Sequence, residues 1–256
     1  MMKGRKSPDE MTFLEHLEDL RKRLFHSIIA LFIAVIPCWI YSPEIYDFLS
    51  RPVTQFLPEG TKMAFTTLTA PFTLYMKVAF LTSAFVTSPY IFYQLWKFVA
   101  PGLFQKEKKY VIPFVLATSA FFLGGATFGY YVAFPFACRF FLNLGSKFTP
   151  VITVDTFFSL TIKLLLGIGL VFEMPTLIFF LSKMGIVTAG WMIKNIKYAI
   201  LVIFITAAII TPTPDMVNQL ILAVPMVALY AISILIALIF GKKKKPKTAE
   251  EPERAG

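Results

Sequence analysis

The sequence predicts an all-α, polytopic membrane protein with six transmembrane helices. Hydrophobic residues make up 57% of the 256 residues, charged residues only 16%, and the mean hydropathy is +0.69. Soluble domains carry about 25% charged residues, so this chain lacks the polar surface needed to cover a water-soluble globule. The composition therefore excludes a soluble enzyme, a disordered chain and a disulfide-stapled secreted module.

Six apolar segments are candidate membrane spans, because a hydrocarbon core of about 30 Å needs roughly 20 apolar residues in a helix. They cover residues 24–41, 71–95, 111–134, 156–182, 198–211 and 216–240. In the third span, Gly125 and Gly129 have the GxxxG spacing that favours close packing of two helices. The first 23 residues are charged and no small-residue cleavage site follows the first span, so we expect no cleavable signal peptide.

The fifth segment is the weakest candidate span. Its 14 residues would cover only about 21 Å as a helix before Thr211-Pro212-Thr213-Pro214-Asp215 imposes a turn. Either the bilayer thins at this point, or the fifth and sixth segments form a re-entrant hairpin. We interpret the segment as a short true span.

Lysine and arginine residues predict the orientation of the spans. Nineteen lie in the N-terminal segment, in the loops after spans two and four and in the C-terminal tail, whereas four lie in the other three loops. Both termini are therefore predicted to be cytoplasmic, and the even number of spans that this requires supports the weak fifth one. The basic tail, residues 242–256, is predicted to be a disordered anchor at the cytoplasmic surface.

Two lysines and three tryptophans lie where the interfaces of the bilayer are expected. Lys77 and Lys163 are about one third of the way from the outer ends of their spans, and we interpret them as side chains that reach the outer interface. Trp39 is near an outer end, whereas Trp96 and Trp191 are beside cytoplasmic ends. These positions are typical of interfacial aromatic residues.

An amphipathic cytoplasmic helix is predicted over about residues 8–23, before the first span. Its apolar residues share one face, and Glu15, Glu18 and Asp19 lie elsewhere around it. One interpretation is that these acids simply face water. A helix that only adheres to an anionic leaflet should, however, carry lysine and arginine on its polar face. The three acids therefore favour a cationic binding partner.

Two further acids are in unusual positions. Glu107 stands among three lysines in the loop after span two, where Pro101-Gly102 predicts a turn. Glu173 is near the midpoint of span four, where burying a charge costs ~3 kcal/mol. Because Pro175 has no N–H, the carbonyl of Val171 loses its helical partner. A carboxylate beside a broken helical bond predicts an intramembrane polar site.

The turn between spans five and six is rich in polar residues. Asp215 or Thr213 can cap the sixth helix, so a structural role alone can explain either residue. Gln219 lies one turn inside that apolar helix, where its amide can hydrogen-bond another helix.

No feature of the chain predicts covalent chemistry or nucleic-acid binding. The net charge is +10, but the basic residues lie at the ends of apolar stretches rather than along one helix face. Cys38 and Cys138 match no metal-binding spacing, and the sequence has no CxxC, HExxH or glycine-rich phosphate motif. We expect no enzymatic activity, no metal and no cofactor.

Taken together, four motifs resemble the TatC family, the multispanning receptors of the twin-arginine protein translocase. They are FLEHLEDLRKRL (13–24), FVAPGLFQKEKK (98–109), FEMP (172–175), and TPTPDMVNQ with the later AVPMVALY (211–230). The motifs occur in the family's order and span most of the chain. The resemblance implies a cupped six-helix domain over residues 1–241, without enzymatic activity, in the bacterial cytoplasmic (inner) membrane.

The resemblance also implies partners and roles for individual residues. Signal peptides of folded proteins would bind at the cytoplasmic face through their paired arginines, at a site formed by Glu15, Glu107, Arg21, Phe98, Pro101 and Leu103. Glu173 would be the polar residue of the cupped face. The single-span partners TatA and TatB would contact Gln219, Thr211 and Asp215. The receptor would also self-associate, and the proton-motive force would drive export.

Chemistry supports the assignment of the two acids. An arginine can form two parallel hydrogen bonds with one carboxylate, and lysine lacks this fork, so a preference for arginine is expected.

The chain departs from the family pattern at Asp19, where a glutamate is common, and at Ala231, where an acid often follows Tyr230.

A small-solute or proton-coupled secondary transporter is the alternative from another class. Glu173 would then be its midplane ion or proton site, with Lys77 or Lys163 as the counter-charge. This alternative does not explain the acidic N-terminal helix or Glu107.

Overall fold

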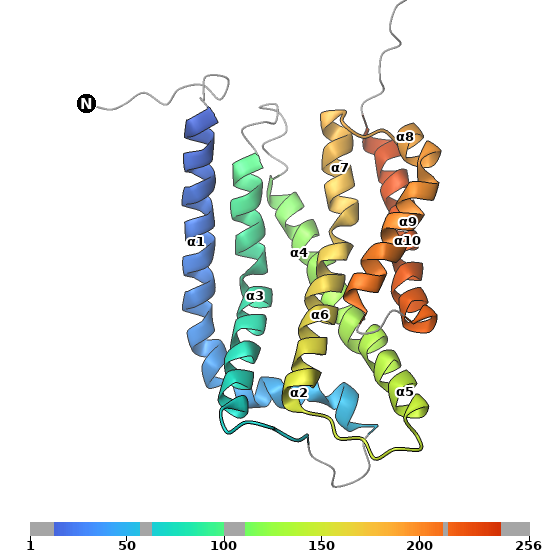
Figure 1. Ribbon diagram of the computed structural model, residues 1–256. Helices are drawn as coiled ribbons and strands as arrows, with labels where there is room; N and C mark the ends of the chain where they lie inside the picture. Colours follow the sequence, from blue (N-terminus) through green and yellow to red (C-terminus); the bar gives the residue numbers. More distant parts are fainter. Residues whose placement is uncertain (1–12, 57–62, 100–110, 212–214, 242–256) are drawn as a thin grey trace, which may run out of the picture.

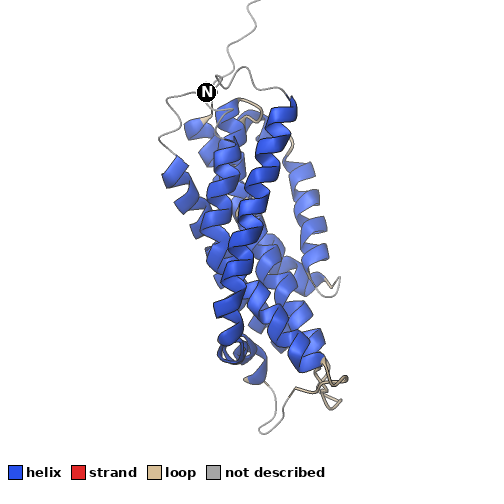
Figure 2. Cartoon of the chain, turned by 90° about the vertical axis from the view of Figure 1, so that its left-hand side faces the viewer, coloured by secondary structure: helices blue, strands red, loops and turns tan. Residues whose placement is uncertain are grey.

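The computed structural model describes residues 13–56, 63–99, 111–211 and 215–241, and over these ranges its regular structure is helical apart from an isolated β-bridge between Ala64 and Thr153. The long helices lie side by side with their axes roughly along one direction, and they form a bundle (Figures 1 and 2). The first helix begins and the last helix ends at the same end of this bundle, called the terminal end below. The other end is called the opposite end. The all-α prediction is confirmed.

The helices follow the predicted spans closely. In chain order they are α1 (Phe13–Ile40), α2 (Ser42–Thr54), α3 (Ala70–Val99), α4 (Val111–Phe128), the π-helical turn η4 (Gly129–Ala133), α5 (Phe134–Leu144), α6 (Val154–Phe172), α7 (Met174–Met184), α8 (Ala189–Lys194), α9 (Ile196–Ile210) and α10 (Met216–Phe240). Among the described residues, five stretches are long and apolar enough to cross a membrane: His16–Ile40, Ala70–Phe98, Ile112–Leu144, Val154–Met184 and Met216–Phe240.

The predicted fifth span corresponds to α9, a shorter apolar helix of 15 residues. At 1.5 Å per residue it covers about 22 Å. In Figure 1 the last turn of α9 and the first turn of α10 stop short of the level that α2 and α5 reach. Length and composition therefore support five spans and one short apolar helix within the described residues.

The N-terminal helix differs from its prediction. The sequence predicted a separate amphipathic helix over residues 8–23, whereas α1 continues from Phe13 to Ile40 without a break. Residues 13–24 contain no glycine or proline, so no signal ends the helix before the first span begins. Residues 8–12 lie outside the described part of the chain.

The sequence did not predict α2, which lies across the opposite end of the bundle (Figure 1). Pro43 stands in its first turn, a position that proline tolerates because the N–H groups there have no helical partner. Leu49, Pro52 and Val53 are buried where α2 packs against α3 and α5. With 13 residues and one apolar face, α2 is too short and too polar to be recognised as a membrane span.

The third long helix extends ten residues beyond its predicted end. It continues through η4 into α5 and ends at Leu144. The wide π turn lies beside Pro135, whose missing N–H removes one regular helical hydrogen bond. Tyr130, within η4, donates a hydrogen bond from its hydroxyl to the carbonyl of Phe48 and stacks on that ring. The turn is thereby tied to α2.

The GxxxG pair lies where α4 and η4 pack closely against α6. A Cβ atom on Gly125 would lie 2.8 Å from the Cβ of Phe172 and 2.9 Å from the Cα of Gly169. A Cβ atom on Gly129 would meet Ile168 at 3.3 Å. The prediction of close helix packing is confirmed, because only hydrogen atoms fit between the two backbones at Gly125.

Trp96 is buried between helices, so its prediction as an interfacial residue was wrong. Its indole Nε1 donates to the hydroxyl of Thr118 at 3.2 Å. Its ring centroid lies 5.0 Å from that of Phe114 and 4.7 Å from that of Phe180. The indole therefore joins α3, α4 and α7. The other two tryptophans are exposed, as expected for interfacial side chains.

We predict that Gly125→Ala destabilises the bundle by about 1–3 kcal/mol, the usual cost of forcing extra carbon into a filled contact. Gly124→Ala is the matched control, because a Cβ atom at Gly124 has no neighbour within 4 Å. Thermal unfolding of the detergent-solubilised protein measures both variants. An equal melting temperature for Gly125→Ala and Gly124→Ala would contradict the packing argument.

Candidate functional site

The start of α1 and the end of α3 meet at the terminal end of the bundle. The two helices pack against each other, and the rings of His16 and Phe98 stack with centroids 4.4 Å apart and planes inclined by 21°. His16 follows Glu15 directly, and Phe98 is the last residue of α3 whose side chain is described. The stack thus brings the backbone of the acidic N-terminal motif beside the residue that opens the second motif.

The structure describes only part of the signal-peptide site assigned from the sequence. Pro101, Leu103 and Glu107 lie outside the described residues. Glu15 is part of α1, but the description does not extend to its side chain. Arg21 is exposed on α1. The roles assigned to these residues stay predictions.

Of the three N-terminal acids, Asp19 has a partner on its own helix. Its Oδ2 accepts a hydrogen bond from Nε of Arg23 at 2.7 Å, one turn further along α1. Pairs at this spacing contribute a few tenths of a kcal/mol to a helix. Glu18 is exposed. Asp19 is thus less available to an incoming cation than the sequence suggested.

Glu173 separates α6 from α7 and is buried, with 6% of its surface exposed. Pro175 stands in the first turn of α7, and the Glu173 amide donates to the carbonyl of Leu170 instead of continuing the α-helical pattern. Within the described residues, Oε1 of Glu173 and the hydroxyl of Thr176 have no hydrogen-bond partner. Such buried polar atoms are rare and require a partner such as water or a ligand. The predicted helix break and polar position are both present.

Asp215 caps α10. Its carboxylate accepts hydrogen bonds from the Asn218 backbone amide at 2.8 Å and from the Asn218 side-chain amide at 3.0 Å. The capping interpretation of Asp215 is therefore confirmed, and Thr213 lies outside the described residues. The cap fixes the direction in which α10 leaves the turn.

Gln219 and Thr211 hold the α9–α10 hairpin together. Gln219 Nε2 donates to the carbonyl of Phe204 on α9 at 2.9 Å, which confirms that its amide bonds another helix. Thr211 is buried, and its hydroxyl donates to the carbonyl of Ala208 at 3.3 Å. Both side chains act within the hairpin, so they shape any partner-binding surface from inside it.

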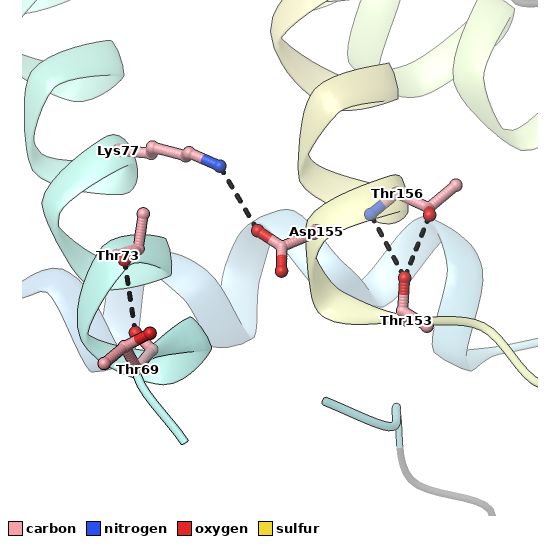
Figure 3. Close-up of polar contacts among 6 residues, drawn as sticks. All are labelled: Thr69, Thr73, Lys77, Thr153, Asp155 and Thr156. Atoms are coloured by element: carbon pink, nitrogen blue, oxygen red, sulfur yellow. Dashed lines mark hydrogen bonds and ion pairs between the residues drawn. The ribbon is translucent and has the colours of Figure 1, made fainter. Parts of the chain in front are cut away.

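An ion pair that the sequence did not predict joins α3 to α6 near the opposite end (Figure 3). Lys77 Nζ lies 3.2 Å from Oδ1 of Asp155, 78 positions along the chain. Asp155 is in the first turn of α6, where the helix dipole favours an anion, and Thr153 caps that helix. Lys77 therefore reaches a carboxylate on another helix, and its position at the outer interface stays a prediction. The cap and the acid after it were visible signals of a helix start.

Comparison with known proteins gives one consistent family. Residues 15–225 match TatC, described as Sec-independent protein translocase protein. A Sec-independent protein translocase protein TatC from Koribacter versatilis is 44% identical over 246 residues, which cover 95% of this chain and 91% of that protein. A protein of the same name from Helicobacter pylori J99 is 41% identical over 228 residues, covering 87% of each.

A solved structure has the same fold. The crystal structure of a twin arginine translocase receptor, TatC, superposes with a TM-score of 0.78 at 33% sequence identity. The match covers 88% of this chain and 99% of that one. The likeness therefore extends over nearly all of the described bundle.

We predict that Lys77→Glu and Asp155→Lys each lower the melting temperature, because each places two like charges together. Combining the two substitutions should restore part of the loss, with a coupling of about 0.2–1 kcal/mol for a partly exposed pair. The control combines Asp155→Lys with Lys163→Glu, which recreates no pair between α3 and α6. Equal recovery in both double variants would rule out a specific Lys77–Asp155 interaction.

Proposed function

Because this chain belongs to the TatC family and is the receptor subunit of a Sec-independent protein translocase, we propose that it binds twin-arginine signal peptides at the terminal end of its bundle. It is a multi-pass membrane protein with a transport role and no enzymatic one. The transporter alternative that relied on Glu173 finds no support in the family match.

The proposal includes an orientation. The terminal end faces the cytoplasm, the chain crosses the bacterial inner membrane six times, and α9 is the short fifth span. The distribution of lysine and arginine supports this topology, because 19 of the 23 bases outside the spans belong to the N-terminal segment, the loops after spans two and four and the C-terminal tail. A span as short as α9 is accommodated by local thinning of the bilayer.

The single observation that carries the proposal is the His16–Phe98 stack. It joins α1, which contains Glu15, to Phe98, the residue that opens the motif containing Glu107. Two carboxylates from separate segments suit two neighbouring guanidinium groups, since each can form a bidentate pair. At the membrane surface the effective dielectric is lower than in bulk water, so such pairs gain strength. Arg21, Phe98, Pro101 and Leu103 would shape this site.

The apolar stretch of the signal peptide would then lie along the spans toward Glu173. Burial of Glu173, and the lack of a hydrogen-bond partner for its Oε1 atom within the described residues, support a polar site at this helix break. Backbone groups near a helix break or an incoming peptide can satisfy such an atom in a medium that offers little water.

TatA- and TatB-type single-span proteins would dock on the α9–α10 hairpin. Thr211, Asp215 and Gln219 fix its geometry, and its outer surface is aliphatic, with Ile205 and Val224 51% and 65% exposed. Helices associate in lipid by packing and by occasional polar contacts, so a rigid surface favours docking. Association between copies of the receptor is part of the same proposal.

We predict that Glu15→Gln and Glu107→Gln each weaken binding of a twin-arginine peptide about 10- to 100-fold, the range for losing one charged hydrogen-bonded pair. Fluorescence anisotropy of a labelled peptide on the purified protein measures this. Glu18→Gln is the matched control, because Glu18 is exposed on the same helix. Replacing both peptide arginines by lysine should reduce the difference among variants, because lysine keeps the charge but loses the bidentate geometry. Unchanged binding in both test variants would reject the proposal.

Docking on the hairpin is testable by photo-crosslinking. A photoreactive residue in place of Ile205 should crosslink to a TatA- or TatB-type partner in membranes. Placed at Ile33 on α1, which is 64% exposed and also faces lipid, it should crosslink at least severalfold less. Equal yields at the two positions would argue against a specific hairpin surface.

A further inference from the structure

A polar cavity of about 360 Å³ lies between α1 and α3 near the terminal end. Its lining residues are Asp19, Lys22, Arg23, His26, Gln94 and Lys97. Four of the six come from two turns of α1 and two come from the last turns of α3. The signal-peptide site and the polar site at Glu173 do not account for this cavity.

The cavity carries an excess of positive charge. Lys22, Arg23 and Lys97 contribute three cations, and Asp19 is the one carboxylate among the lining residues. Asp19 is already bound by Arg23 at 2.7 Å. The Lys97 ammonium lies 5.6 Å from the ring centroid of Tyr93 on the same helix, within the range of a cation–π contact. Two net positive charges therefore face a space large enough for a small anionic group.

The position of the cavity matches the depth of lipid headgroups. Lys22 and Arg23 directly precede the apolar run of α1, and Lys97 follows the apolar run of α3. Beside the cavity and further along α1, the helix exposes apolar side chains, with Phe25 63% and Phe32 56% exposed. Such a surface suits acyl chains, while the cations beside it suit a phosphate. The two features are continuous along the same helix.

We propose that this cavity binds the headgroup of an anionic phospholipid, with its acyl chains along α1. Basic pockets between transmembrane helices on the cytoplasmic side are the usual way in which proteins hold such lipids. A twin-arginine peptide is an unsuitable occupant because the three cations repel it. The bound lipid joins α1 to the end of α3 beside the His16–Phe98 stack, since Asp19 lies about one turn from His16 and Lys97 directly precedes Phe98.

The proposal predicts selective lipid retention by the full chain. In native mass spectrometry of the detergent-purified protein, phosphatidylglycerol should remain bound more strongly than phosphatidylcholine. Lys22→Gln combined with Lys97→Gln should weaken phosphatidylglycerol binding about fivefold for each lysine removed. Lys194→Gln combined with Lys197→Gln is the matched control, because it removes two exposed cations elsewhere at the terminal end.

Two further experiments distinguish the loss of charge from a loss of folding, and lipid binding from binding of free phosphate. Lys22→Arg with Lys97→Arg should retain lipid, since the charge is kept. Inorganic phosphate should displace phosphatidylglycerol poorly, because it has no acyl chains. Equal lipid binding by wild type and the Lys22/Lys97 glutamine variant, equal loss in the control, or displacement by phosphate at lipid concentrations would each overturn the proposal. No signal peptide is involved, so the outcome is independent of the proposed receptor site.

Discussion

Hydrocarbon offers no hydrogen-bond partners, so each backbone amide and carbonyl within the bilayer must be satisfied inside its own helix or by a neighbour. This requirement produces the long helices, and it makes irregular turns within them informative. At Glu173 and Pro175 the α-helical ladder breaks, and a buried carboxyl lies at the break. At η4 the helix widens beside Pro135, and Tyr130 bonds the backbone of α2. Each irregular turn therefore carries a polar side chain, Glu173 at the break and Tyr130 in η4.

The central frame of the protein consists of α3, α4 and α6. Gly125 lets the backbones of α4 and α6 approach closely, and Trp96 joins α3 to α4 and α7 through a buried hydrogen bond and two ring contacts. Near the opposite end, the Lys77–Asp155 pair connects α3 to α6. Because interior contacts of this kind are close-packed, the frame can hold attached helices in fixed positions. The first helix is attached to it along α3 and keeps an apolar face toward lipid.

The terminal end combines two kinds of charge in neighbouring places. The acidic motif at the start of α1 suits a cationic peptide, and the basic cavity beside it, between α1 and α3, suits an anionic headgroup. A lipid held there would neutralise cations that would otherwise weaken the attraction of arginine side chains, since Coulomb interactions at about 10 Å remain appreciable when water is partly excluded. The receptor site and the lipid site would then act together, although none of the residues proposed to bind the signal peptide lines the cavity.

The sequence by itself determined the helical class, the positions of the long apolar helices, the break at Pro175 and the cap at Asp215. These depend on hydrophobicity over a window and on the missing N–H of proline, which are local properties of the chain. Family motifs also identified the candidate site, although Pro101, Leu103 and Glu107 lie beyond the described residues. Only the tertiary structure decided that α2 crosses the opposite end, that Trp96 is buried and that Lys77 meets Asp155. The physical reason is distance along the chain: a partner 78 positions away leaves no periodic trace near Lys77, and helix packing alone brings the two charges together.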